Sequence, residues 1–157
     1  MNAARTVRLL AAACVAAVAA GCTTTGVAAP VRSRPVGAVA LVLSHAGGTA
    51  TATLVDTSEA RQFAALLPVT VELRDVWGQA KSGRLPATIT VEGSRPVHDP
   101  VPGEIYFWPR TDVIAIYYAD LGQQVPDPGL IRLGAVDSGL AGVDGRVRIE
   151  LAPTDNT

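Results

Sequence analysis

Apolar and polar side chains alternate along much of the chain from Val36 onward. Residues 49–55, Thr-Ala-Thr-Ala-Thr-Leu-Val, and residues 69–74 show this alternation most clearly. A period of two is typical of a strand that buries one face and exposes the other. Together with short β-branched apolar runs, the pattern predicts strands over residues 36–44, 49–55, 69–74, 85–91, 104–108, 113–118, 130–136 and 146–151.

One helix is expected between the second and third of these strands. Asp56 or Ser58 can cap its start, because a short polar side chain accepts a hydrogen bond from the free backbone N–H groups there. Four apolar residues then recur at helical spacing before Pro68 ends the helix: Ala60, Phe63, Ala64 and Leu67.

The remaining segments are predicted to be connections. Residues 75–78 form a turn, residues 94–103 contain three prolines and form a loop, and Asp137 or Ser138 caps a short helical turn that ends at Ala141. Many short strands with one or two short helices predict a mainly β fold, a small closed barrel. Closing the sheet removes exposed strand edges, which would otherwise pair with other chains.

The first 22 residues follow a different pattern. Arg5 and Arg8 precede an apolar run over residues 9–20, and a glycine and a cysteine follow it. A charged start, an apolar run of about 7–15 residues and a small-residue end are typical of a secretory signal peptide. A membrane-spanning helix needs about 20 apolar residues, so this run is too short to span.

The end of this signal is similar to a bacterial lipobox. Residues 18–22 read Val-Ala-Ala-Gly-Cys, and cleavage before Cys22 leaves a cysteine that carries a diacylglyceryl thioether and an acyl chain such as palmitate on its amine. Acyl chains contribute about 0.8 kcal/mol per buried CH₂ and hold a protein on a membrane without a helix. The alternative is an ordinary signal that is cleaved near Ala29. The lipobox predicts three parts: a signal peptide over residues 1–21, a lipid-anchored tether over residues 22–35 and a folded domain over residues 36–157.

Charge and cysteine content narrow the function classes. Cleavage removes Arg5 and Arg8 and leaves 11 of the 13 basic residues against 14 acidic ones, a net charge of −3. Binding to nucleic acid requires a basic surface, so no nucleic-acid partner is expected. Cys14 leaves with the signal and Cys22 is acylated, so the folded domain is expected to hold no disulfide and no cysteine metal site.

The usual catalytic patterns do not occur. His45 and His98 lie in loop-like stretches without a third ligand at metal spacing. Ser138 is not part of a Gly-x-Ser-x-Gly elbow. We therefore predict no metal, no cofactor and no catalytic residue.

Several blocks resemble one known family when they are taken in order. They are residues 56–68 (DTSEARQFAALLP), 102–107 (PGEIYF), 114–118 (IAIYY) and 133–139 (LGAVDSG). Their order and spacing are similar to the bacterial cyclophilin-like family, over roughly residues 48–151. The resemblance implies a closed cyclophilin-type β-barrel flanked by helices, but it does not imply an activity, because function is grafted onto folds.

Peptidyl-prolyl isomerase activity is the enzymatic alternative. Such an enzyme needs an apolar pocket for the proline ring and an arginine that stabilises the twisted amide. The signature of true cyclophilins, an arginine followed by Phe-His-Arg and a later Gln-Phe-Phe, is absent. The arginines that could substitute are Arg61, Arg74, Arg84, Arg95, Arg110 and Arg132.

Aromatic residues are concentrated in one predicted hairpin. Five of the seven lie within residues 106–118. Because alternate strand residues face opposite sides, Tyr106 and Trp108 share one face, Phe107 takes the other, and Tyr117 and Tyr118 split between core and surface. The candidate ligand-binding residues are Tyr106, Phe107, Trp108, Arg110 and Tyr118. In the alternative interpretation, these rings pack beneath the loop over residues 96–102.

These observations lead to one functional hypothesis and two alternatives. The hypothesis is a lipoprotein on the extracytoplasmic face of the bacterial cell membrane, whose cyclophilin-like domain binds a peptide or small ligand without catalysis. The first alternative is a divergent prolyl isomerase that assists exported proteins. The second is an envelope protein that acts only through partner contacts.

Overall fold

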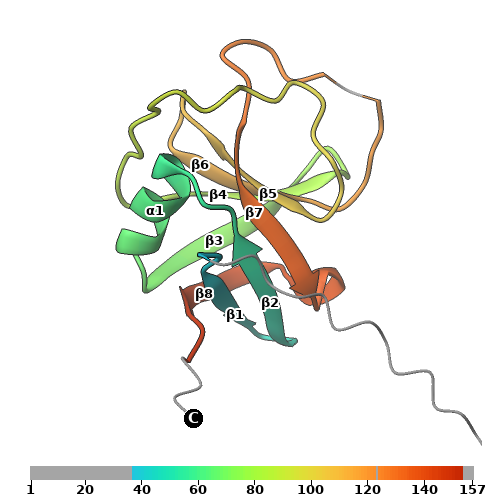
Figure 1. Ribbon diagram of the computed structural model, residues 1–157. Coiled ribbons are helices and arrows are strands. Elements are labelled where there is room, and N and C mark those ends of the chain that lie inside the picture. Colours follow the sequence, from blue (N-terminus) through green and yellow to red (C-terminus); the bar gives the residue numbers. More distant parts are fainter. Residues whose placement is uncertain (1–36, 123, 154–157) are drawn as a thin grey trace, which may run out of the picture. The chain divides into compact units, whose positions relative to one another are not determined.

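The computed structural model describes residues 37–122 and 124–153, which form a closed barrel of eight antiparallel strands (Figure 1). The predicted signal peptide, Cys22 and the tether lie outside the described residues. The strands are β1 (Ala40–His45), β2 (Gly48–Leu54), β3 (Val69–Val76), β4 (Ala80–Arg84), β5 (Glu104–Trp108), β6 (Val113–Tyr117), β7 (Ile131–Ser138) and β8 (Gly145–Leu151). Neighbours follow the order β1-β2-β7-β5-β6-β4-β3-β8, and β8 pairs back onto β1. The predicted closed, mainly β barrel is confirmed.

Apolar side chains at alternate strand positions fill the interior of this barrel. Leu41 and Leu43 of β1, Val71 of β3 and Ile149 of β8 all point into one buried cluster, while the residues between them face outward. Helix α1 (Ser58–Ala65) adds Phe63 to the same cluster. Burial of these side chains is the main stabilising contribution to the barrel.

A second apolar cluster lies outside the barrel wall, on β4, β5 and β6. It contains Ala80, Tyr106, Ala115, Tyr117 and Leu130, and Val97, Trp108 and Val125 pack against it. The long connections over residues 85–103 and 118–130 form the upper part of the molecule, above these strands (Figure 1). They are joined to each other by two backbone hydrogen bonds between Val97 and Leu130, of 2.7 and 2.9 Å. Because both faces of β5 and β6 are covered, these strands are apolar almost throughout rather than alternating.

The N-cap of α1 differs from the prediction. Thr57 is the cap, and its Oγ1 accepts a hydrogen bond from the backbone N–H of Ala60 at 3.2 Å. Asp56 instead pairs with the guanidinium of Arg61. The choice of Asp56 or Ser58 was therefore wrong by one residue, because all three neighbouring side chains have capping chemistry and the backbone direction decides among them.

One predicted strand is also wrong, and one strand was missed. Residues 85–91 form no strand: Leu85 and Ile89 pack in the interior cluster, and Thr90 exchanges two hydrogen bonds of 2.9 Å with the side chain of Gln62 on α1. The true strand is β4, whose sequence Ala-Lys-Ser-Gly-Arg lacks an apolar alternation. It is held between β3 and β6. Gly83 is required there, because an added Cβ would lie 2.4 Å from the carbonyl oxygen of Glu72.

The helical turn after β7 begins later than predicted. Strand β7 continues through Ser138, and a 3₁₀ turn follows over Leu140–Gly142 with Gly139 as its N-cap. Asp137 accepts a hydrogen bond from the hydroxyl of Thr53 at 2.7 Å, and Ser138 bonds Thr51 at 2.9 Å. These cross-strand hydrogen bonds to β2 occupy the two side chains that the sequence suggested as caps.

Candidate functional site

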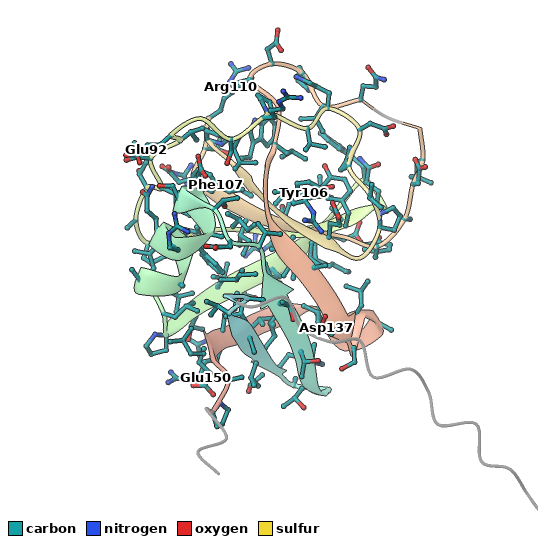
Figure 2. All side chains as sticks on the ribbon, viewed as in Figure 1. Glu92, Tyr106, Phe107, Arg110, Asp137 and Glu150 are labelled. Atoms are coloured by element: carbon teal, nitrogen blue, oxygen red, sulfur yellow. The ribbon has the colours of Figure 1, made fainter. Side chains whose placement is uncertain are left out.

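The two strand faces hold the aromatic residues as the alternation predicted, but most of the rings are buried. Phe107 lies in the barrel interior and Tyr106 lies in the outer cluster, both at 0% exposure (Figure 2). The Tyr106 hydroxyl accepts from the backbone N–H of Val101 at 3.0 Å and donates to Glu104 at 2.5 Å. Burial raises the Tyr106 pKa, and the hydrogen bond to Glu104 adds to this effect. Tyr106 therefore packs beneath the predicted loop.

Tyr117 and Tyr118 split between core and surface, also as predicted. Tyr117 packs edge-on against Tyr106 with 5.6 Å between ring centroids. Tyr118 is exposed at the edge of the outer cluster, and its hydroxyl donates to Asp75 at 2.5 Å. This hydrogen bond raises the Tyr118 pKa and lowers the Asp75 pKa. Lys81 also pairs with Asp75, at 3.2 Å, so this polar cluster fixes the end of β3.

Arg110 lies apart from these rings, in the connection between β5 and β6. Its guanidinium donates to the carbonyl oxygen of Asp127 at 3.5 Å, and it lies among the upper connections of the molecule (Figure 2). Of the five candidate residues, Tyr106 and Phe107 are buried, Tyr118 and Arg110 are bonded to neighbouring segments, and Trp108 is half-buried.

Trp108 lines a cleft of about 340 Å³ on the outer face of the molecule. Three segments meet there: the end of β5, the β3–β4 turn and the connection between β6 and β7. The lining residues are Trp77, Gln79, Trp108, Gln124, Val125 and Pro126, which we call the tryptophan cleft. Both tryptophans of the chain are in this group.

Trp77 has an unusual backbone and an unusual exposure. Its φ is +54° and that of Gly78 is +69°, and the backbone N–H of Gln79 donates to the carbonyl of Val76 at 3.2 Å. Positive φ at both central residues is typical of a type I′ turn, which favours asparagine, aspartate or glycine there. The left-handed conformation costs a residue with a Cβ about 1–2 kcal/mol. Trp77 is also 71% exposed, which is unusual for so large an apolar side chain.

The turn is nevertheless held firmly. The backbone N–H of Gly78 donates to Asp75 Oδ1 at 2.8 Å. The carbonyl of Gln79 accepts from the backbone N–H groups of Tyr118 and Ala119, at 2.8 and 3.2 Å. The position of Trp77 beside the β6–β7 connection is therefore set by the backbone and does not depend on packing of its own ring.

Two further features define what the tryptophan cleft can bind. Its six lining residues are uncharged, and none of them is an arginine. The indole Nε1 of Trp108 is shut off from solvent and has no hydrogen-bond acceptor among the described residues. A buried donor without an acceptor destabilises a fold by about 1–3 kcal/mol. The lining of the cleft is therefore aromatic and neutral.

An arginine does line a different cleft. This second cleft, of about 320 Å³, is bounded by Ala38, Leu54, Val55 and Arg132, among other residues. The Nε of Arg132 donates to Glu104 at 2.6 Å, so its charge is already paired. Arg132 is the β7 partner of Tyr106 in the register, and neither Phe107, which faces the barrel interior, nor Trp108 lines its cleft.

The two histidines are occupied by neighbouring backbone groups. His45 Nδ1 accepts from the backbone N–H of Gly47 at 3.2 Å, and His98 Nδ1 lies 2.8 Å from the carbonyl oxygen of Val125. Among the residues that the structure describes, no three His, Cys, Asp or Glu side chains gather closely enough to hold a metal ion. No helix within residues 37–122 and 124–153 is long and apolar enough to cross a membrane.

Comparison with known proteins agrees with the barrel. A model described as the cyclophilin-like family matches residues 43–152, so the chain belongs to that family. Its fold is similar to the solution structure of a hypothetical protein from Archaeoglobus fulgidus, with a TM-score of 0.54, 17% identity and coverage of 73% of this chain and 95% of that chain. A search of curated proteins finds no match.

Trp77 is the cleft residue that the strand alternation does not predict, because it lies in a turn outside the aromatic hairpin. The available signal was the turn itself, Asp75-Val76-Trp77-Gly78, because a tryptophan stands where a two-residue hairpin favours a small polar residue.

Proposed function

We propose that the domain is a non-catalytic binding module whose ligand places an uncharged ring in the tryptophan cleft. Trp77 carries this proposal. A large apolar side chain that is 71% exposed on a left-handed backbone lowers the stability of the free protein. A bound ligand that covers the indole would explain why the protein carries this residue despite its cost in stability.

The chemistry of the lining favours a neutral ligand. Rigid indole rings give a large contact area at a small cost in conformational entropy. Gln124 supplies an amide that can donate and accept a hydrogen bond. A charged group would lose its hydration in the cleft without meeting an opposite charge. The ligand is therefore a small molecule or a peptide side chain with a flat or puckered uncharged ring.

The two tryptophans allow a direct test of binding. Because both line the cleft, intrinsic fluorescence of the full chain reports almost entirely on this site. A panel of uncharged cyclic amides, indoles and pyranosides is titrated while fluorescence and ligand-observed NMR are recorded. We expect at least one class to bind, and Trp77→Asn to weaken it by tenfold or more, about 1.4 kcal/mol.

The matched control for this variant is Leu151→Asn. Leu151 is also a large exposed apolar residue, at 51%, but it lies at the end of β8 outside the cleft. This control should bind as well as the unchanged protein. If no class binds, or if both variants bind equally well, the cleft is not the ligand site.

The second part of the proposal is the anchor. A lipid on Cys22 holds the domain at the extracytoplasmic face of a bacterial membrane, and the tether over residues 22–35 separates the two. A tether of this length spans at most about 50 Å when extended. Cys22→Ala should move the protein from the membrane to the soluble fraction, whereas Cys14→Ala, in the predicted signal, should leave it on the membrane. Continued membrane retention of Cys22→Ala would contradict lipidation.

A protease-coupled assay on a proline-containing peptide separates binding from isomerase activity. We expect no acceleration at micromolar protein, because no arginine lines the tryptophan cleft. Acceleration by the full chain that Arg132→Gln abolishes would replace the binding module with the enzymatic alternative.

A further inference from the structure

A shallow depression of about 440 Å³ lies on the outer face of the barrel and shares no lining residue with the tryptophan cleft. It is lined by Ser44, His45, Thr70, Arg146 and Arg148, from β1, β3 and β8. These strands are neighbours in the barrel, in the order β3-β8-β1. The site is therefore built on paired strands and not on a loop.

The register brings the polar side chains into one row. Arg148 is the partner of Ser44 on one side and of Thr70 on the other. Arg146 precedes Arg148 by two residues, so both guanidinium groups stand on the same outward face of β8. Two arginines and two hydroxyls thus surround one point on the surface.

The lining groups are hydrogen-bond donors and include no carboxylate. Arg146 has no ion-pair partner among the described residues. Arg148 uses its Nε for Glu150 at 3.0 Å, which leaves its two terminal amino groups for another acceptor. His45 Nδ1 accepts from the backbone N–H of Gly47, and its Nε2 is shut off from solvent beside Gly142, so His45 adds no donor to the depression.

Two neighbouring carboxylates reduce the positive charge around the depression, but neither of them lines it. Glu150 pairs with Arg148, and Glu72 is the β3 partner of Arg146 in the register. Neither carboxylate lines the depression, and Glu72 makes no ion pair within the described part of the chain. The inner surface therefore presents donors to whatever enters it.

We infer that this depression binds a tetrahedral oxyanion, a phosphate group held by Arg146 and Arg148 and flanked by the hydroxyls of Ser44 and Thr70. Guanidinium groups bind phosphate through paired, charge-assisted hydrogen bonds, and hydroxyls supply the remaining donors. The phosphate is either free or part of a lipid headgroup. This inference does not depend on the proposed ligand of the tryptophan cleft.

Titration of the full chain in neutral maltoside micelles tests the site. The probes are inorganic phosphate and dihexanoyl phosphatidylglycerol, each compared with sodium chloride at equal ionic strength, and the readout is the ¹H–¹⁵N NMR signals of Ser44, Thr70 and Arg148. We expect saturable shifts with at least one probe. Shifts with phosphate alone identify the free anion, and shifts with the lipid alone identify the headgroup.

The variant Arg146→Gln/Arg148→Gln should weaken binding at least tenfold, with unchanged signals from the rest of the barrel. Arg74→Gln is the matched control, because Arg74 is an exposed, outward-facing arginine of β3 that does not line the depression. It should reduce affinity less than twofold. Equal losses in both variants would show general charge attraction and overturn the inference, as would the absence of saturable shifts.

Discussion

Helix α1 and the β3–β4 turn both direct large side chains toward segments outside the barrel, and they leave those side chains in opposite states. On α1, Glu59 is 1% exposed and accepts hydrogen bonds from the backbone N–H of Glu92 at 2.7 Å and from the hydroxyl of Ser94 at 2.6 Å. On the turn, Trp77 is 71% exposed. The first side chain has its hydrogen-bond partners within the chain, whereas the second lies largely in solvent.

The difference extends to the neighbouring residues. The Gln62 side chain donates to the carbonyl oxygen of Thr90 and accepts from its N–H. It thereby supplies the pair of backbone hydrogen bonds that a neighbouring strand would otherwise provide. In the tryptophan cleft, by contrast, the N–H of Trp108 has no acceptor among the described residues. Buried polar groups in folded proteins are normally satisfied. Glu59 and Gln62 therefore hold neighbouring segments to α1, whereas the N–H of Trp108 stays unpaired and shut off from solvent beside Trp77.

Replacing Glu59 should have the largest effect on stability. Burial by itself would raise the pKa of Glu59, but the hydrogen bonds from Ser94 and Glu92 outweigh it and lower the pKa below its ordinary value of 4.5. Glu59→Gln replaces a charge-assisted acceptor and turns an amide donor toward Ser94. We expect a loss of about 1–3 kcal/mol in the free energy of unfolding at pH 7, measured by urea denaturation.

The same variant has a defined pH dependence. Because folding lowers the pKa of Glu59, its ionised form stabilises the protein above the ordinary value of 4.5, and this stabilisation is lost as pH falls through the folded pKa. The difference between Glu59→Gln and the unchanged protein should therefore shrink as the pH falls below 4.5. Glu72→Gln, at an exposed position on β3, is the control and should change stability by less than about 0.5 kcal/mol. A loss no larger than that of the control would mean that α1 does not hold the segment in this way.

The parts of the fold that follow local rules could be predicted from the sequence. Strands β2, β3 and β8 alternate clearly, and α1 follows from its apolar spacing and from Pro68, although its cap lies one residue from the predicted ones. Strand β4 could not be predicted, because lysine, serine and glycine have low strand propensity and its neighbours impose the strand state. Residues 85–91 have the composition of a strand, but Leu85 bonds the carbonyl oxygen of Asp112 and Thr90 bonds Gln62 of α1.

Only one of the two tryptophans of the candidate site could be predicted from the sequence, because the other depends on long-range strand pairing. The alternation in β5 placed Tyr106 and Trp108 on one face, and the structure confirms this. Trp77 and Trp108 line the same cleft because β4 pairs with both β3 and β6. No local sequence pattern contains this long-range register. The sequence therefore located one wall of the cleft and left the other in a turn.

Trp77→Asn should have the smaller effect on stability, and in the opposite direction. Asparagine adopts the left-handed conformation more readily than tryptophan, and the exposed indole contributes little packing in the free protein. We expect the free energy of unfolding to rise by up to about 1 kcal/mol in the absence of ligand. Urea denaturation of the full chain measures this change, and Leu151→Asn, which removes an exposed apolar side chain without relieving a turn, should give no increase. A loss of more than about 0.5 kcal/mol in Trp77→Asn would show that the indole supports the fold itself, and the contrast with Glu59 would then disappear.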